Sequence, residues 1–125
     1  MDENPKTKFG KQKPSLGLIP KIALEAAAAA HQIGAEKYGA WNWREKDVSA
    51  MVYINATLRH IQEWKEVADN DPETGASHLG NVIACCNILL DAQDNNCLID
   101  DRPKKRLENN EIKSQSNKLK KLEGK

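Results

Sequence analysis

The chain has 125 residues, of which 39% are hydrophobic and 30% are charged. This composition is typical of one globular domain with a modest core. No apolar stretch reaches the roughly 20 residues of a membrane span, and the polar start lacks the apolar region of a signal peptide. Three cysteines without CxxC spacing argue against a disulfide framework or a zinc site. We therefore expect a cytoplasmic protein with reduced thiols and no membrane partner.

Charge is unevenly distributed along the chain. Residues 1–100 carry 10 Lys/Arg and 14 Asp/Glu, whereas residues 101–125 carry 9 and 4. An acidic body suits a site that collects divalent metal ions. The basic tail could contact nucleic acid or could simply be solvated, and we favour the second interpretation.

The first elements in chain order are a flexible segment and a helix. Residues 1–15 are polar and rich in lysine, and we expect them to form a flexible N-terminal segment. Pro20 suits the first position of a helix over residues 20–38, and Gly39 can end it. Residues 39–48 then form a loop rich in tryptophan and charge.

A second helix is predicted over residues 50–67, with Ser49 as its N-cap. Its apolar residues recur at spacings of three and four and form one stripe, namely Met51, Ile54, Leu58 and Ile61. Its polar residues form a coherent strip on the other side, namely Asn55, Arg59, Glu63 and Glu66. The helix is thus amphipathic.

The remaining elements are a turn, a third helix and a tail. Residues 68–76 read as a turn, and residues 77–96 as a helix that is apolar nearly all round and therefore central. Residues 99–125 form a polar, basic tail that we expect to be disordered or a frayed helix. Because no strand-like alternation is present, we predict an all-α fold, a small helical bundle, over residues 16–98.

Four carboxylates near the end of the second helix are candidate metal ligands. Glu63 and Glu66 lie three residues apart on one helix face, and Asp71 and Glu73 follow in the turn. Mg²⁺ takes oxygen ligands and shares them with substrate phosphates, and like charges gathered in one place need a cation. Each pattern also has an ordinary structural explanation, a solvated charged face and a turn that caps the next helix.

Polar residues on the other elements are candidates for catalysis and substrate binding. His60 could meet His78 in space, in a catalytic role or as satisfied structural groups, and Asn81 follows one turn later. At the end of the first helix, Lys37 could contact phosphate, and in the loop that follows, Asn42 could read a purine edge and Trp43 could stack on a base. The alternative for the tryptophans is that they cover the end of the bundle.

Several of these segments together resemble a known family. The resemblance runs from about Lys13 to Leu90 and includes KPSLGLIPKIALEAAA, GAEKYGAWNW, the Arg59-His60 pair, DPETGASHL and the apolar helix with Asn87. In this order and spacing, the segments resemble the phage dATP/dGTP diphosphohydrolases, a group within the MazG-like all-α nucleoside-triphosphate pyrophosphohydrolases. The group often has Gly-Glu just before the DxETG turn, where this chain has Val67-Ala68.

The resemblance implies a metal-dependent enzyme in the host cytoplasm that forms a homodimer or a higher homo-oligomer. It would hydrolyse a purine deoxynucleoside triphosphate, dGTP or dATP, to the monophosphate and pyrophosphate with Mg²⁺ or Mn²⁺.

The wider superfamily binds its metal with ExxE on one helix and ExxD on the next. Glu63 and Glu66 match the first motif, but residues 78–81 read HLGN rather than ExxD. Asp71, Glu73 or Asp91 would then supply the missing carboxylate.

The resemblance also suggests roles for individual residues. Glu63 or Glu66 would act as the general base when it is not a metal ligand. Lys37 and Arg59 would offset the charge of the phosphates, and the Asn42–Trp43 segment would enclose the base. The alternative function is a non-catalytic nucleotide-binding or regulatory helical module, and a nucleic-acid-binding accessory protein is the less favoured third possibility.

Overall fold

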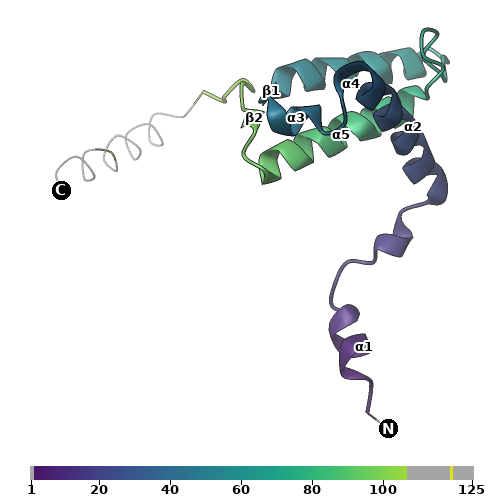
Figure 1. Cartoon of the computed structure of the whole chain (residues 1–125), viewed down its shortest axis with the longest axis vertical. Coiled ribbons are helices and arrows are strands. Elements are labelled where there is room, and N and C mark those ends of the chain that lie inside the picture. Colours follow the sequence, from purple (N-terminus) through teal and green to yellow (C-terminus); the bar gives the residue numbers. More distant parts are fainter. Residues whose placement is uncertain (1, 107–118, 120–125) are drawn as a thin grey trace.

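The computed structural model describes residues 2–106 and residue 119. Three helices form the body of the molecule, α2 (Lys21–Tyr38), α4 (Ala50–Lys65) and α5 (His78–Asp94). Helix α5 packs against both α2 and α4, so the prediction that it is the central helix is confirmed (Figure 1). The all-α class is also confirmed, and in the described part of the chain no helix is long and apolar enough to cross a membrane.

The helices begin and end near the predicted residues because the predicted capping residues make their hydrogen bonds or turns there. The side chain of Ser49 accepts a hydrogen bond from the backbone N–H of Val52 at the start of α4, and Ser77 does the same for Gly80 at the start of α5. Gly39 ends α2 with a positive φ of 90°. Pro20 is the N-cap of α2 rather than its first helical residue, one position from the prediction.

Helix α4 ends two residues earlier than predicted, in a tight C-terminal turn. The N–H of Val67 donates to the carbonyl of Trp64, and the N–H of Ala68 donates to the carbonyl of Glu63. This pair of bonds defines a Schellman motif, which requires a left-handed residue at its centre. Val67 occupies that position with a φ of 68°, in the region that favours glycine.

A glycine allows α2 and α5 to approach closely. A Cβ atom added to Gly80 would lie 2.6 Å from the carbonyl oxygen of Ala26, which is too short for any real contact. The facing surface of α2 is made of small residues, and Ala27 and Ala30 are buried there. The two backbones are therefore close enough that only glycine fits at position 80.

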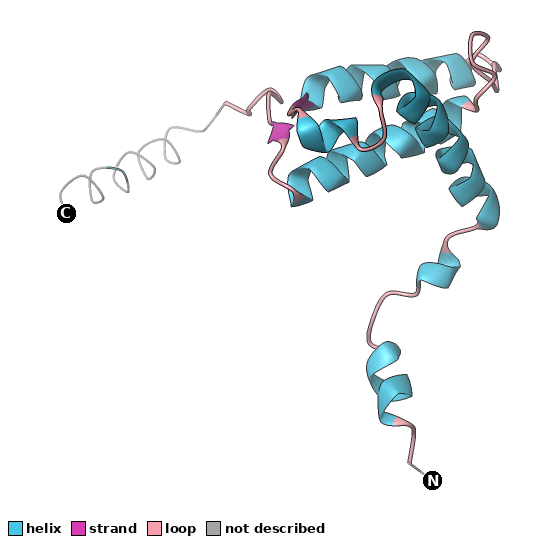
Figure 2. Cartoon of the chain, viewed as in Figure 1, coloured by secondary structure: helices cyan, strands magenta, loops and turns pink. Residues whose placement is uncertain are grey.

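Several short elements depart from the predictions. The N-terminal segment contains a short helix, α1 (Pro5–Gly10), and a 3-10 turn over Leu16–Leu18, and both extend away from the bundle (Figure 1). The loop after α2 contains α3 (Asn42–Glu45). Within the all-α class, two short strands that the sequence did not indicate, β1 (Val48–Ser49) and β2 (Leu98–Ile99), pair in parallel (Figure 2). Such two-residue strands are too short to show alternation. The predicted tail lies largely outside the described residues.

The core of the single chain is small. Its buried hydrophobic residues are mainly alanines, together with Trp43 and Cys97, and no large side chain of the described residues is fully buried. The apolar stripe of α4 is only partly covered, because Leu58 and Ile61 are exposed. The face of α4 that carries Tyr53, Thr57 and His60 lies toward α5, since His60 contacts His78 and Thr57 is close enough to Cys85 to affect its pKa.

Candidate functional site

A hollow lies between α2, the tryptophan loop and α5. Its volume is about 670 Å³, within the range of pockets that hold small molecules. Tyr53 of α4 closes part of the wall. The lining is mostly apolar or aromatic and carries a few polar groups, among them His31, Trp41, Asn42, Trp43, Asn81 and Asn87. This combination suits a flat ligand with a polar edge.

One wall of the pocket is fixed by a carboxylate of α5. The indole N–H of Trp43 donates to Asp91 Oδ2 at 2.7 Å, and the guanidinium of Arg44 donates to both Asp91 oxygens at 2.8 and 2.7 Å. These bonds, with the Arg44 guanidinium first, hold the pKa of Asp91 at about 2. Asp91 therefore stays charged at neutral pH and orients α3 against α5.

Trp41 lies at the mouth of the pocket in an unusual backbone conformation. It has a left-handed φ of 59°, which is uncommon for a bulky residue. Its ring packs on Trp43 at 5.3 Å between centroids and lies 4.4 Å from the guanidinium carbon of Arg44. These contacts offset the backbone cost, about 1–3 kcal/mol for such a conformation. Trp41 is 55% exposed, so its ring is available to a ligand.

The floor of the pocket contains a polar pair in a largely apolar surface. The amide nitrogen of Asn87 lies 3.1 Å from His31 Nε2, and the His31 ring lies 6.1 Å from the ring of Trp43. Burial raises the pKa of Tyr53 and of Cys85, so both are neutral at pH 7. The pocket thus offers aromatic faces and neutral hydrogen-bonding groups, with its one carboxylate, Asp91, already engaged.

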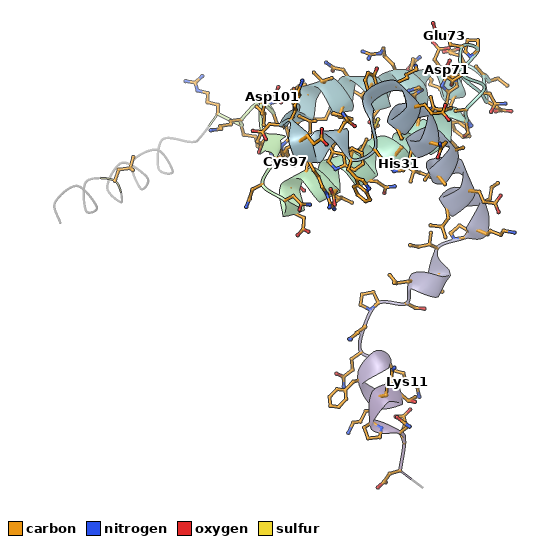
Figure 3. All side chains as sticks on the ribbon, in the orientation of Figure 1. Lys11, His31, Asp71, Glu73, Cys97 and Asp101 are labelled. Carbon is orange, nitrogen blue, oxygen red and sulfur yellow. The ribbon has the colours of Figure 1, made fainter. Side chains whose placement is uncertain are left out.

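A second cluster lies at the other end of α5. His60 Nδ1 is 2.9 Å from His78 Nδ1, as the sequence suggested, and Asp71 approaches both. The three residues each offer a ligand atom, and these atoms all lie within 4.8 Å of one another. His78 is only 3% exposed, and its Nε2 has no hydrogen-bond partner. Figure 3 places Asp71 and Glu73 at one end of the bundle, with His31 nearer its middle.

The turn that carries Asp71 is fixed to the start of α5. The N–H of His78 donates to the carbonyl of Asp69, and the N–H of Asp71 donates to the carbonyl of Ala76. Asp71 Oδ1 accepts the N–H of Glu73 at 2.8 Å. Burial, followed by His78, lowers the pKa of His60, although Asp71 opposes this shift. A neutral imidazole keeps a lone pair for a ligand.

The predicted carboxylates are distributed differently around this cluster. Asp71 joins the two histidines, and Glu63 is close enough to His60 to act on its pKa. Glu63, Glu66 and Glu73 are all exposed. In the part of the chain that the structure describes, these three glutamates do not enter the group that Asp71 forms.

The predicted substrate residues separate into two sets. Asn42, Trp43 and Asn81 line the pocket, whereas Lys37 and Arg59 are exposed and do not line it. Neither His31 nor Arg44 was predicted from the sequence to belong to the site. A histidine within an alanine-rich helix was the available signal for His31, and nothing local marked the partner of Arg44, which lies 47 residues away.

The fold and the site define a small helical domain with a pocket lined by aromatic residues. The chain belongs to the family described as dATP/dGTP diphosphohydrolase, N-terminal, whose model matches residues 3–102. It is similar to a protein of Salmonella phage PMBT28 named dATP/dGTP diphosphohydrolase, with 30% identity over 95 residues. The match covers 76% of this chain and 32% of the relative, so the chain spans about a third of the relative's length. No solved structure matches the chain.

Proposed function

We propose that the protein hydrolyses a purine deoxynucleoside triphosphate, dGTP or dATP, to the monophosphate and pyrophosphate, and so shapes the supply of DNA precursors. The observation that carries this proposal is the aromatic pocket of about 670 Å³ in a chain of this family. The printed name of the phage relative supports the substrate class.

The pocket has the chemistry that a purine base needs. Trp41 supplies an exposed ring for stacking, and base–aromatic stacking contributes about 1–3 kcal/mol per base. Asn42 and Asn81 supply amide groups that can both donate to and accept from a base edge. Because Asp91 holds the indole of Trp43, the aromatic wall is in place before a ligand binds.

The triphosphate would extend beyond the pocket toward exposed charged groups. Lys37 and Arg59 contribute positive charge for the phosphates, and Glu63 or Glu66 acts as the general base on the attacking water. A bound divalent ion, Mg²⁺ or Mn²⁺, would neutralise phosphate charge and lower the pKa of that water. Exposed Glu63 and Glu66 fit Mg²⁺ only as a pair that shares the ion with substrate phosphates.

The activity is tested by incubating the purified chain with each dNTP and with Mg²⁺ or Mn²⁺, and measuring pyrophosphate. We expect release from dGTP or dATP, loss of release after exhaustive chelation, and loss in Glu66→Gln with the fold retained. Turnover that survives chelation, or an active Glu66→Gln variant, contradicts this metal and base assignment. Lys65→Gln, a neighbouring exposed charge, is the matched control and should stay active.

A second candidate function follows from the short length of this chain compared with the phage protein that it resembles. Because the chain spans about a third of that protein, it could act as a nucleotide-binding or regulatory module. Saturable quenching of tryptophan fluorescence by dGTP, without pyrophosphate release under any metal condition, would favour this module over the enzyme.

We further propose that two or more copies associate. Two large apolar side chains of neighbouring turns, Leu58 and Ile61, remain exposed on one side of α4 in the single chain. Burying such a side chain contributes about 1.5–3 kcal/mol, so a second copy is a strong candidate to cover this side. Light scattering should give at least twice the monomer mass, and Leu58→Lys should reduce it. A monomeric wild-type chain contradicts this proposal.

A further inference from the structure

We propose that His60, Asp71 and His78 form a binding site for a divalent transition-metal ion, separate from any Mg²⁺ held by the exposed glutamates. The residues come from α4, the following turn and the first residue of α5. Three chain segments thus bring three ligand-type side chains to one point, with all ligand atoms within 4.8 Å of one another.

The two histidines face each other through their ring nitrogens. The 2.9 Å between the Nδ1 atoms requires something positive between them, because two bare lone pairs would repel. A single shared proton satisfies one donor and one acceptor, while a metal ion satisfies both lone pairs and attracts the carboxylate as well. With metal–nitrogen bonds of about 2.1 Å, this separation gives about 90° at the ion, the angle between neighbouring octahedral ligands.

The burial of His78 adds an independent observation. Its side chain is nearly inaccessible, and one ring nitrogen, Nε2, has no partner among the described residues. A buried polar atom without a hydrogen-bond partner destabilises the folded state by about 1–3 kcal/mol. An apolar side chain would fill the same space without this cost. Coordination through the other ring nitrogen gives the residue a favourable interaction that offsets this cost.

The donor set determines the kind of metal. Two imidazole nitrogens and one carboxylate oxygen suit Mn²⁺, Fe²⁺, Co²⁺ or Zn²⁺, whereas Mg²⁺ prefers oxygen ligands and water. Asp71 retains a second oxygen, because its turn uses Oδ1 to accept the N–H of Glu73. Three protein ligands also leave coordination positions open for water or for an anionic group.

The site lies beside the pocket along two helices. Asn81, which lines the pocket, follows His78 by one turn, and Tyr53, which also lines it, precedes His60 by about 10 Å of helix. If the pocket holds a purine, we infer that a phosphate of the same ligand reaches an open position of the ion. This last point rests on the proposed function, whereas the metal site does not.

The site is tested with the full chain, stripped of metal and titrated with Co²⁺ as a spectroscopic probe. We expect one ion per chain, with visible absorption typical of nitrogen and oxygen ligands, displacement by Zn²⁺ and no displacement by excess Mg²⁺. Absorption typical of thiolate ligands, or equal competition by Mg²⁺, would overturn the proposal.

Variants separate ligation from structure. His60→Ala should weaken Co²⁺ binding at least about tenfold. Asp71→Asn keeps an oxygen that can accept the Glu73 N–H, so the turn should survive while Co²⁺ affinity falls. His31→Ala removes the histidine outside the cluster and should leave the affinity unchanged. Unchanged binding in folded His60→Ala and Asp71→Asn contradicts the site.

Adding pyrophosphate to the Co²⁺ complex then tests the link to the pocket. An unchanged spectrum would contradict that link and leave the metal site itself unaffected.

Discussion

At the C-terminal half of α5, both oxygens of Asp91 are engaged by Trp43 and Arg44, whereas at its first residue the buried ring of His78 has one nitrogen without a partner. In the first region the carboxylate has its hydrogen-bond partners within the chain, and it lies in the wall of the pocket. In the second region the side chains of His60, Asp71 and His78 lie close together, and His78 Nε2 has no hydrogen-bond partner among the described residues. This difference is why we propose a base as the ligand of the first region and a cation as the ligand of the second.

The pocket depends on the close approach of α2 to α5, and Gly80 is where that approach can be broken. Gly80→Ala places a methyl group against the Ala26 carbonyl oxygen, so we expect the free energy of unfolding to fall by about 3 kcal/mol, measured by urea denaturation. Gly34→Ala is the matched control, because its Cβ meets nothing within 4 Å, and it should raise stability by up to about 1 kcal/mol. Equal effects of the two substitutions would mean that the helices are not tightly packed.

The charge on Asp91 should make the pocket region sensitive to acid. Because the pKa of Asp91 is held at about 2, below its unfolded value of about 3.9, its contribution to stability is complete above the unfolded value and is lost as pH falls toward about 2. The Tm difference between wild type and Asp91→Asn should therefore be constant from about pH 5 to pH 8 and should shrink between about pH 4 and pH 2. Asp94→Asn, at an exposed carboxylate on the same helix, is the matched control and should change the Tm at pH 7 much less than Asp91→Asn.

The smallest predicted effect concerns the turn that leads to the histidine region. Val67 is exposed and holds a left-handed φ of 68°, so Val67→Gly should stabilise the protein by about 1 kcal/mol in urea denaturation. Val52→Gly, an exposed residue with ordinary helical backbone, should lower stability by a few tenths of a kcal/mol. A loss of stability in Val67→Gly would show that the valine side chain makes a contact that outweighs its strain.

Local signals in the sequence predicted the fold well. Ser49, Ser77 and Gly39 marked helix ends because caps act on neighbouring backbone groups, and the apolar character of α5 predicted its central place. The β1–β2 pairing joins segments 50 residues apart through two residues each, and no periodicity could show it. The exposure of Leu58 also could not be foreseen, because periodicity identifies an apolar stripe but not the partner that covers it.

The candidate site was likewise predicted only where its residues lie in short segments with local sequence signals. The meeting of His60 and His78 and the pocket positions of Asn42 and Trp43 followed from short segments next to helix ends. The Arg44–Asp91 and His31–Asn87 contacts join residues 47 and 56 positions apart, and only the packing of α2 and α3 on α5 creates them. The roles of Glu63, Glu66 and Glu73 stay predictions.

The most direct test of the account is the kinetics of pyrophosphate release from dGTP by wild type and Trp41→Ala. If the aromatic pocket holds the base while other groups act on the phosphates, removing the exposed indole should raise KM about tenfold, the equivalent of about 1.4 kcal/mol of stacking, and leave kcat nearly unchanged. An unchanged KM in Trp41→Ala, or a wild-type chain that releases no pyrophosphate from any purine dNTP, would contradict it.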